Sequence, residues 1–298
     1  MTANKLICPR TLSRAAAGAL ALLLAVALSA APALAQEAGN QSEKQQQLER
    51  LKQTYAQGIQ AAKQNEASTA YENLEEALQL AQATEQQGAA QKIQQYLVQL
   101  PKQWGNQALK NQEYEEALTH FNKGLEHDDQ MAYLHYGKGL ALINLERVEE
   151  AMESLTTAIE QGQATGDQNT ARLATERIRD HYVSLASQAL NAQNPSRARA
   201  TQAIEYLDAM EAYVEPDADA YFYRATALYH LGQYEEAIAA ARQGLELFNG
   251  SRSDEAKYHF VIGESYVALD NIEAAKEEFR QAAYGDYKPR AEHYLETL

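Results

Sequence analysis

A spacing of 34 residues recurs along this chain and constrains its fold more than any other feature. Gly105 and Gly139 are 34 residues apart, and so are Ala117 and Ala151. Within each unit, one small residue precedes a second by 12 positions, and a core position follows four further on. Self-similarity at such a period is the signature of stacked supersecondary units. The 12-residue spacing recurs in three more pairs, which are Gly58/Ala70, Ala225/Ala237 and Gly263/Ala275.

This pattern predicts pairs of antiparallel helices that cross closely. Small side chains let two backbones approach, and larger apolar residues one turn further along fill the space beside them. Apolar residues recur at spacings of three and four, which is the helical period, and strand signals are lacking. Turn-like breaks such as Leu231–Tyr234 separate the helices. A Glu pair such as Glu235-Glu236 then opens the second helix, where the helix dipole favours negative charge.

Two segments resemble the tetratricopeptide-repeat family. LGQYEEAI at 231–238 and EYEEALTHFNKGL at 113–125 are similar to that family's inter-helix turn and second helix. The chain departs from the family pattern because the proline that commonly closes a unit is missing almost everywhere, Pro216 being the main exception. The resemblance covers five units of regular length, at 51–84, 98–131, 132–165, 218–251 and 256–289.

We therefore predict an all-α fold, an α-solenoid of about six antiparallel helix pairs in a right-handed superhelix, within a repeat domain at 50–298. A degenerate sixth unit occupies 166–217, with Ala186 and Ala203 in the small-residue positions. The tail Lys288–Leu298 is predicted to be a capping helix that shields the last pair. Extra residues of helical composition predict longer helices at two places, Gln86–Leu100 and Thr170–Gln193.

Residues 1–35 have the pattern of an export signal peptide. A basic start is followed by an uncharged apolar run and by small residues that end in Ala33-Leu34-Ala35, which fits cleavage before Gln36. The alternative is a retained membrane anchor, because the apolar stretch approaches spanning length. Pro32 and the small residues around it favour cleavage. The mature chain is then expected to be exported to the periplasm or the exterior, without a transmembrane segment.

The next segment, 36–49, is Gln-rich and nearly free of apolar side chains. Such a composition buries too little surface to order itself, so we interpret it as a polar linker or a frayed helix start. Cys8 is the only cysteine and precedes the apolar run. Cleavage would therefore leave a mature chain without a thiol, a disulfide or a lipid-accepting cysteine.

The charge balance excludes two classes of partner. The chain has 41 acidic and 26 basic side chains, and its formal net charge is −15. All the acidic residues follow residue 36, so the mature chain is more negative still. Nucleic-acid binding needs a basic face that displaces counterions, and docking on anionic lipid needs the same. We therefore expect neither.

No catalytic constellation is present in the sequence. The seven histidines form no i,i+4 pair and no H-E-x-x-H run. His127-Asp128-Asp129 has metal-ligating residue types, but such a run is more typical of a solvated turn. Gly137-Lys138-Gly139 lacks the remaining glycine, the Lys-Ser/Thr pair and the preceding strand of a phosphate-binding loop. We therefore predict a protein that is not an enzyme and has no cofactor and no metal site.

The first helix of each pair is expected to line a concave wall. Helical phase places aromatic side chains at several inward positions of this wall. Large aromatic rings supply contact area at low entropic cost, and tyrosine adds a hydroxyl for peptide groups. The alternative is that these rings pack between neighbouring units, and the sequence leaves both interpretations open. The five aromatic residues are Tyr133, Tyr136, Phe222, Tyr229 and Phe260.

Lys102 and Asn106 lie one turn apart on a predicted first helix. Some tetratricopeptide domains grip a C-terminal carboxylate with such a pair, so the resemblance implies a clamp at these positions. The next unit has Gly137 where the family has an asparagine, and no basic partner is evident beyond it. A solvated polar face is the alternative interpretation.

These observations predict a non-catalytic protein–protein interaction scaffold of the bacterial cell envelope. It would hold an extended peptide or a partner helix in the aromatic groove. One alternative is a periplasmic protein that binds a small hydrophobic ligand, and another is a structural protein that self-associates as a homodimer. The partner itself cannot be named, because repeats of this kind serve many unrelated assemblies.

Overall fold

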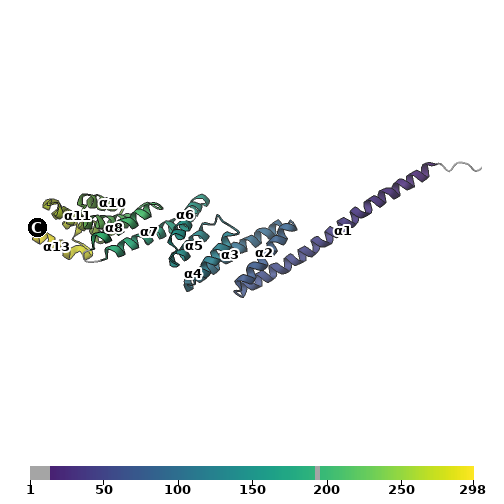
Figure 1. Ribbon diagram of the computed structural model, residues 1–298, viewed down its shortest axis with the longest axis horizontal. Coiled ribbons are helices and arrows are strands. Elements are labelled where there is room, and N and C mark those ends of the chain that lie inside the picture. The colour runs from purple at the N-terminus through teal and green to yellow at the C-terminus, as the bar shows by residue number, and fades with distance from the viewer. Residues whose placement is uncertain (1–13, 192–194) are drawn as a thin grey trace, which may run out of the picture. The chain divides into compact units, whose positions relative to one another are not determined.

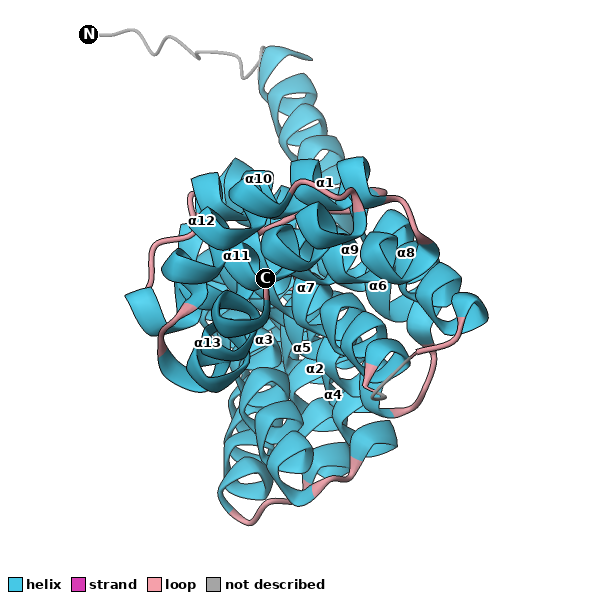
Figure 2. Ribbon diagram, turned by 90° about the vertical axis from the view of Figure 1, so that its left-hand side faces the viewer, coloured by secondary structure: helices cyan, strands magenta, loops and turns pink. Residues whose placement is uncertain are grey.

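The computed structural model describes residues 14–191 and 195–298, with side chains from Gly39 onward. No strand occurs in these segments, as Figure 2 shows. The chain divides into two compact units, Met1–Leu100 and Pro101–Leu298. The elements, labelled in Figure 1, are α1 (Arg14–Lys63), α2 (Ala67–Ala83), α3 (Gln87–Asn111), α4 (Tyr114–Leu125), α5 (Ala132–Asn144), α6 (Val148–Thr165), α7 (Gln168–Leu190), α8 (Arg197–Glu211), α9 (Ala218–Leu231), α10 (Tyr234–Leu247), α11 (Arg252–Ala268), α12 (Ile272–Ala282), the 3₁₀ turn η1 (Gly285–Tyr287) and α13 (Lys288–Thr297).

The helices pack in consecutive pairs, and this confirms the predicted all-α solenoid. In unit 1, α1 packs against α2. In unit 2, the pairs α5/α6, α7/α8, α9/α10 and α11/α12 each pack internally, and α6, α8 and α10 also contact the helix that follows them. The first helices also touch one another, α5 with α7, α7 with α9 and α9 with α11. The predicted capping helix is α13, which packs against α12.

The start of the chain contains the predicted export signal. Residues 1–13, with the basic Lys5 and Arg10, lie outside the described residues. From Arg14 the backbone of α1 is helical without a break, so the predicted linker segment 36–49 belongs to this helix. Within the described part of the chain, no helix combines the length and apolarity that a membrane crossing requires.

The small residues of the repeat lie where two helices meet most closely. A Cβ atom added to Gly105 of α3 would come within 2.7 Å of the Phe121 ring of α4. At Gly58 of α1 the same test meets Leu74 of α2 at 2.8 Å, and at Gly263 of α11 it meets Phe279 of α12 at 2.8 Å. Real Cβ contacts are essentially never this short, so a larger residue at these positions would force the facing side chain to shift within a packed core.

The turns between the paired helices share one backbone conformation. The residue two positions before the second helix has a positive φ in five pairs, and the angles lie between 58° and 80°. Glycine adopts this left-handed region without steric cost. Of these five turns, the α9–α10 turn alone has a glycine at this position. The five turn residues are Asn65 (63°), Gln112 (65°), Glu146 (60°), Gly232 (80°) and Asp270 (58°).

Two first helices are longer than their neighbours, as predicted from the extra residues. α3 has 25 residues and α7 has 23. α3 continues through Pro101, where the boundary between the two units falls. Proline has no N–H, so the helical hydrogen bond to the carbonyl of Leu97 is missing at this point.

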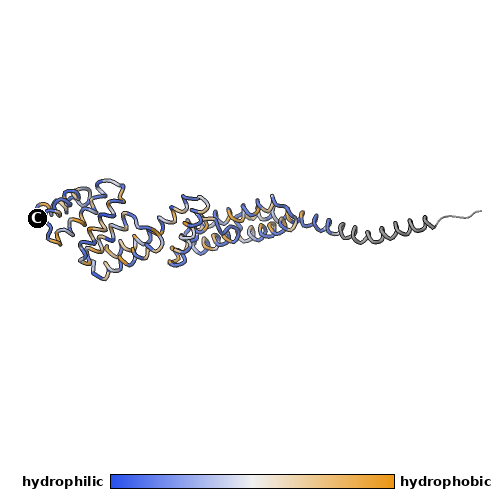
Figure 3. Tube along the Cα trace, turned by 90° about the horizontal axis from the view of Figure 1, so that it is seen from above, coloured by the Kyte–Doolittle hydropathy of each residue, from blue (hydrophilic) through white to orange (hydrophobic). Residues whose placement is uncertain are grey.

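The core of unit 2 is built from apolar residues that face the neighbouring helices. Hydrophobic and hydrophilic positions alternate along these helices, as Figure 3 shows. The largest cluster extends from α6 to α9 and includes Leu155, Ile178, Leu207 and Met210, all fully buried. Ala186 and Ala203 of the degenerate unit are also fully buried, as expected for small residues at a helix crossing.

The close crossing at Gly105 leads to a first prediction. Gly105→Ala should lower the free energy of unfolding by about 1–3 kcal/mol, because the added methyl group collides with Phe121 in a packed core. The matched control is Gly88→Ala on the same helix, since nothing lies within 4 Å of a Cβ atom there. Urea denaturation of both variants checks this. Equal stabilities would contradict the role of the crossing.

Candidate binding groove

Four of the predicted groove residues lie together on α3 and α5. The hydroxyl of Tyr133 donates a hydrogen bond to Oδ1 of Asn106 at 3.2 Å. The ammonium of Lys102 lies 4.1 Å from the centroid of the Tyr133 ring, in a cation–π contact. The ring of Tyr136 meets that of Tyr133 edge to face, with 6.1 Å between the centroids. We call these four residues, Lys102, Asn106, Tyr133 and Tyr136, the tyrosine cluster.

The tyrosine cluster is anchored and still accessible. All four side chains are half-buried, and Tyr136 packs against the core of unit 2. Burial raises the pKa of Tyr136, and the positive charge of Arg177 on α7 partly offsets that rise. Tyr136 is therefore a neutral phenol at physiological pH and can donate a hydrogen bond.

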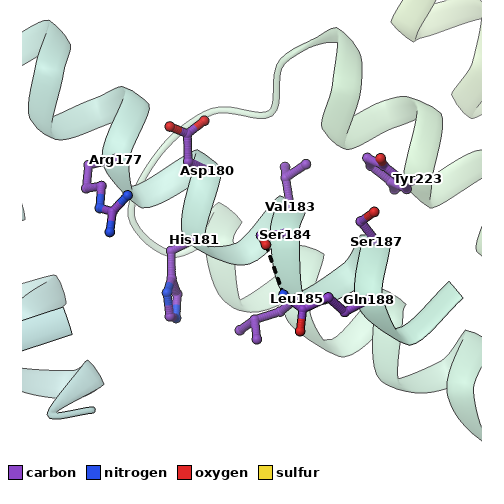
Figure 4. Close-up of a pocket in the computed structure, with 9 residues that line it drawn as sticks. All are labelled: Arg177, Asp180, His181, Val183, Ser184, Leu185, Ser187, Gln188 and Tyr223. Carbon is purple, nitrogen blue, oxygen red and sulfur yellow. Dashed lines mark hydrogen bonds between the residues drawn. The ribbon is translucent and has the colours of Figure 1, made fainter. Parts of the chain in front are cut away.

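α7 adds two basic side chains that the sequence analysis missed. Arg177 and His181 are one turn apart and leave the same side of α7, as Figure 4 shows. They line a pocket of about 560 Å³ together with Ser184, Gln188 and, from α9, Tyr223. The helix that carries them is capped by Asp167, whose carboxylate accepts a hydrogen bond from the Thr170 N–H at 3.1 Å.

Both basic side chains of this pocket have unused hydrogen-bonding capacity. Nε of Arg177 and Nε2 of His181 are buried and make no hydrogen bond with any described residue. Burial, and then the charge of Arg177, lower the pKa of His181. An unpaired buried polar group costs free energy, so a ligand that supplies an acceptor to Arg177 is favoured at this place.

The sequence analysis found no basic partner for the carboxylate clamp beyond the unit around Gly139, and the structure places Arg177 close enough to Tyr136 to influence its pKa. Arg177 lies in the degenerate unit 166–217, where the longer helix breaks the 34-residue alignment. The signal that could have found it was local. Arg177 and His181 are spaced i,i+4, and this spacing places them on one helix face.

Phe222 and Tyr229 lie on α9 and are partly covered by other side chains. Lys257 of α11 is 4.9 Å above the Phe222 ring and pairs with Asp219 at 2.5 Å. The ring of Tyr229 is 5.7 Å from that of Tyr234, and burial raises the pKa of Tyr229 to about 12. Both residues are half-buried and also pack against the core of this part of unit 2.

Phe260 is a core residue in the structure, which corrects its predicted place in an open groove. Its side chain is 1% exposed. The C-terminal segment covers it, with the rings of Tyr287 and Tyr294 at 5.2 and 6.0 Å and the guanidinium of Arg290 at 4.1 Å. The physical reason is that α13 and η1 close the last pair with their own aromatic residues, and this leaves no room for a partner.

Comparisons with known proteins match three segments of the chain to one repeat family. Models of the tetratricopeptide repeat match residues 102–166, 218–251 and 256–284. These segments cover less than half of the chain and contain the tyrosine cluster, the helices α9, α10 and α12, and most of α11. These three segments are therefore similar to the tetratricopeptide repeat, the family that the sequence resembles. No curated protein matches the chain in sequence.

Several solved structures of tetratricopeptide-repeat proteins are similar to this chain at low identity. YrrB, described as a TPR protein with an unusual peptide-binding site, is 21% identical over 67% of this chain and 91% of its own, with a TM-score of 0.34. TTC0263 of Thermus thermophilus is 22% identical over 66% and 98%, with a TM-score of 0.29. MamA of Desulfovibrio magneticus RS-1 is 22% identical over 65% and 96%, with a TM-score of 0.37. None of these likenesses bears on what this chain binds.

The contact between α11 and the C-terminal helix α13 gives a second prediction. Glu264 of α11 accepts hydrogen bonds from Arg290 at 3.2 Å and from the Tyr294 hydroxyl at 3.3 Å. Burial raises the pKa of its carboxyl, although Arg290 opposes the rise. The folded chain therefore holds this proton more tightly than the unfolded chain does, and this contribution to stability falls as pH rises from about 4.3 through the folded-state pKa.

Glu264→Gln should remove this pH-dependent loss of stability, because glutamine does not titrate. The free energy of unfolding of the variant minus that of the wild type should therefore increase from pH 4 to pH 7. Urea titrations at four pH values check this. Glu292→Gln on α13 is the matched control, because Glu292 is exposed. A difference for Glu264→Gln that stays constant with pH would contradict the prediction.

Proposed function

We propose that this protein is an interaction scaffold that binds an extended peptide against the tyrosine cluster and the neighbouring face of α7. Tetratricopeptide repeats support a role in protein–protein interaction, and proteins of this family are in general non-catalytic. The carrying observation is that fixed aromatic rings and an unsatisfied arginine donor lie on adjacent first helices of unit 2.

The arrangement can recognise both the side chains and the backbone of a peptide. Tyr133 is held in place by Asn106 and Lys102, so its ring is ordered before a partner arrives, and preorganisation lowers the entropic cost of binding. Tyr136 offers a hydroxyl donor for a peptide carbonyl. Arg177 lines the pocket, and its guanidinium can pair there with a carboxylate or a carbonyl.

The pocket lined by Arg177 and His181, called the α7 pocket from here on, has a chemistry that distinguishes this proposal from the small-ligand alternative. Its lining consists largely of arginine, aspartate, histidine, serine and glutamine side chains. Sites for hydrophobic ligands are predominantly apolar with few polar groups. The α7 pocket therefore fits the polar groups of a peptide better than a hydrophobic small molecule.

Capture of partners from a native envelope extract tests the groove. Wild-type protein should recover a partner that is lost with Tyr133→Ala/Tyr136→Ala, since both rings of the cluster are removed. The matched control is Tyr213→Ala/Tyr284→Ala, which removes two exposed tyrosines outside the cluster. Circular dichroism verifies that each variant is folded. Recovery that is the same for both double variants would move the site elsewhere.

Arg177→Gln gives a finer measurement on the recovered partner. It keeps the aromatic packing and removes the charge, so we expect binding weaker by about tenfold, the value of a hydrogen bond to a charged group. Isothermal titration checks this. Unchanged affinity would leave the tyrosine cluster as the binding element and exclude the α7 pocket.

We also propose that the protein is exported from a bacterial cytoplasm to the cell envelope. The support is the N-terminal sequence, with its basic start, its apolar run and the Ala33-Leu34-Ala35 ending. Cleavage there would leave a mature chain in which α1 begins at Gln36.

Intact-mass measurement of protein purified from the envelope fraction of a bacterial host should therefore give a chain that starts at Gln36. Ala35→Arg should block processing, because cleavage requires a small residue at this position. A wild-type chain that keeps residues 1–35 would show that the segment is retained as an anchor.

A further inference from the structure

Unit 1 contains a slot that the proposed function does not use. It lies between α1 and the N-terminal half of α3 and has a volume of about 240 Å³. Its apolar floor is formed by Leu48, Leu51, Ala89 and Ile93, and two lysines stand at its rim, Lys52 on α1 and Lys92 on α3. We call these six residues the α1–α3 slot.

The slot is preformed. Leu51 is 6% exposed and Ile93 is 1% exposed, so both are held by the packing of the helices. Tyr55 forms part of the wall, and its ring lies 6.2 Å from that of Tyr96. The ammonium of Lys92 lies 5.7 Å from the centroid of the Tyr55 ring, which keeps this charge beside the opening.

The size of the slot decides which kind of ligand it fits. Sites for cofactors and drug-sized molecules typically enclose roughly 300–1,000 Å³ and surround most of the ligand. At about 240 Å³ the slot is smaller than this range and suits one or two apolar side chains. Large apolar residues inserted into such pockets are the anchors of protein interfaces.

The charges around the slot decide the chemistry of the partner. Two lysines line the slot, Lys52 on α1 and Lys92 on α3, and α3 carries no acidic residue, in a chain whose net charge is −15. Lys52 pairs with Glu49 at 2.8 Å, but both side chains are more than two-thirds exposed, and such pairs exchange partners at little cost. Lysines on both walls therefore favour carboxylates on either side of an inserted apolar residue.

We propose that the α1–α3 slot is a second docking site, which receives a leucine or phenylalanine side chain of a partner segment whose flanking residues are aspartate or glutamate. The apolar side chain fills the space above Leu51 and Ile93. The flanking carboxylates pair with Lys52 and Lys92 from opposite sides.

Fluorescence anisotropy with the purified protein tests this site. The probe is a fluorescein-labelled peptide in which one Leu-Phe pair stands between two pairs of glutamates. We expect it to bind at least about tenfold more tightly than a probe with lysines in place of the glutamates, and than one with Ala-Ala in place of Leu-Phe. Binding should weaken as salt rises, because the rim charges are screened.

Three variants locate the probe. Lys52→Glu/Lys92→Glu should weaken binding of the acidic probe by at least about tenfold, because the two new glutamates repel the glutamates of the probe. Lys63→Glu/Lys110→Glu is the matched control, since it changes the net charge equally, lies on the same two helices and replaces exposed lysines outside the slot. Ala89→Trp fills the space and should also abolish binding.

The outcome separates this proposal from the first one. Equal affinity for the acidic and basic probes, equal loss in both double reversals, or no binding of the acidic probe by wild type would each overturn the slot. Tyr133→Ala/Tyr136→Ala should leave probe binding unchanged, because the tyrosine cluster shares no residue with the slot. Loss of the probe in that variant would assign it to the groove of unit 2 and would also overturn the slot.

Discussion

The structure depends on one type of contact, in which a large side chain of one helix fills the space that a glycine leaves on another. Phe121 of α4 lies against Gly105 of α3 and also against Gly137 of α5. The Phe121 ring thus packs between the two helices of its own pair and also against the first helix of the next pair. Leu155 against Gly139 and Phe279 against Gly263 repeat the contact further along. Because an added methyl group would force the facing side chain to move, these crossings help to set the positions of the first helices.

Close crossing of the pairs brings the first helices side by side, and this makes a continuous surface possible. Tyr133 on α5 can reach Asn106 on α3, and Arg177 on α7 lies near enough to influence the pKa of Tyr136. None of these contacts is local in sequence. The charge pattern adds to this. In this strongly acidic chain the first helices α3 and α5 carry no acidic side chain, and both of the proposed binding sites include a lysine of α3.

The end of the array shows how a repeat protein limits its own surface. By its position in the repeat, Phe260 belongs to the wall of first helices, but η1 and α13 cover it with Tyr287, Arg290 and Tyr294. A terminal repeat has no neighbour to bury its exposed face, so the chain supplies a cap. The cost is that Glu264 becomes buried beside this cap, and its pKa rises.

The sequence by itself predicted the helix pairs and the small-residue crossings, because these follow from a period of 34 residues and from local helical spacing, whereas it did not predict that α1 already begins at Arg14. It also placed Lys102, Asn106, Tyr133 and Tyr136 on the same wall, since the regular units around Gly105 and Gly139 align. Only the tertiary structure decided that Phe260 is covered and that Arg177 and His181 face the pocket. The reason is physical: a cap and a lengthened helix change which side chains meet, and those contacts depend on packing between helices far apart in the chain.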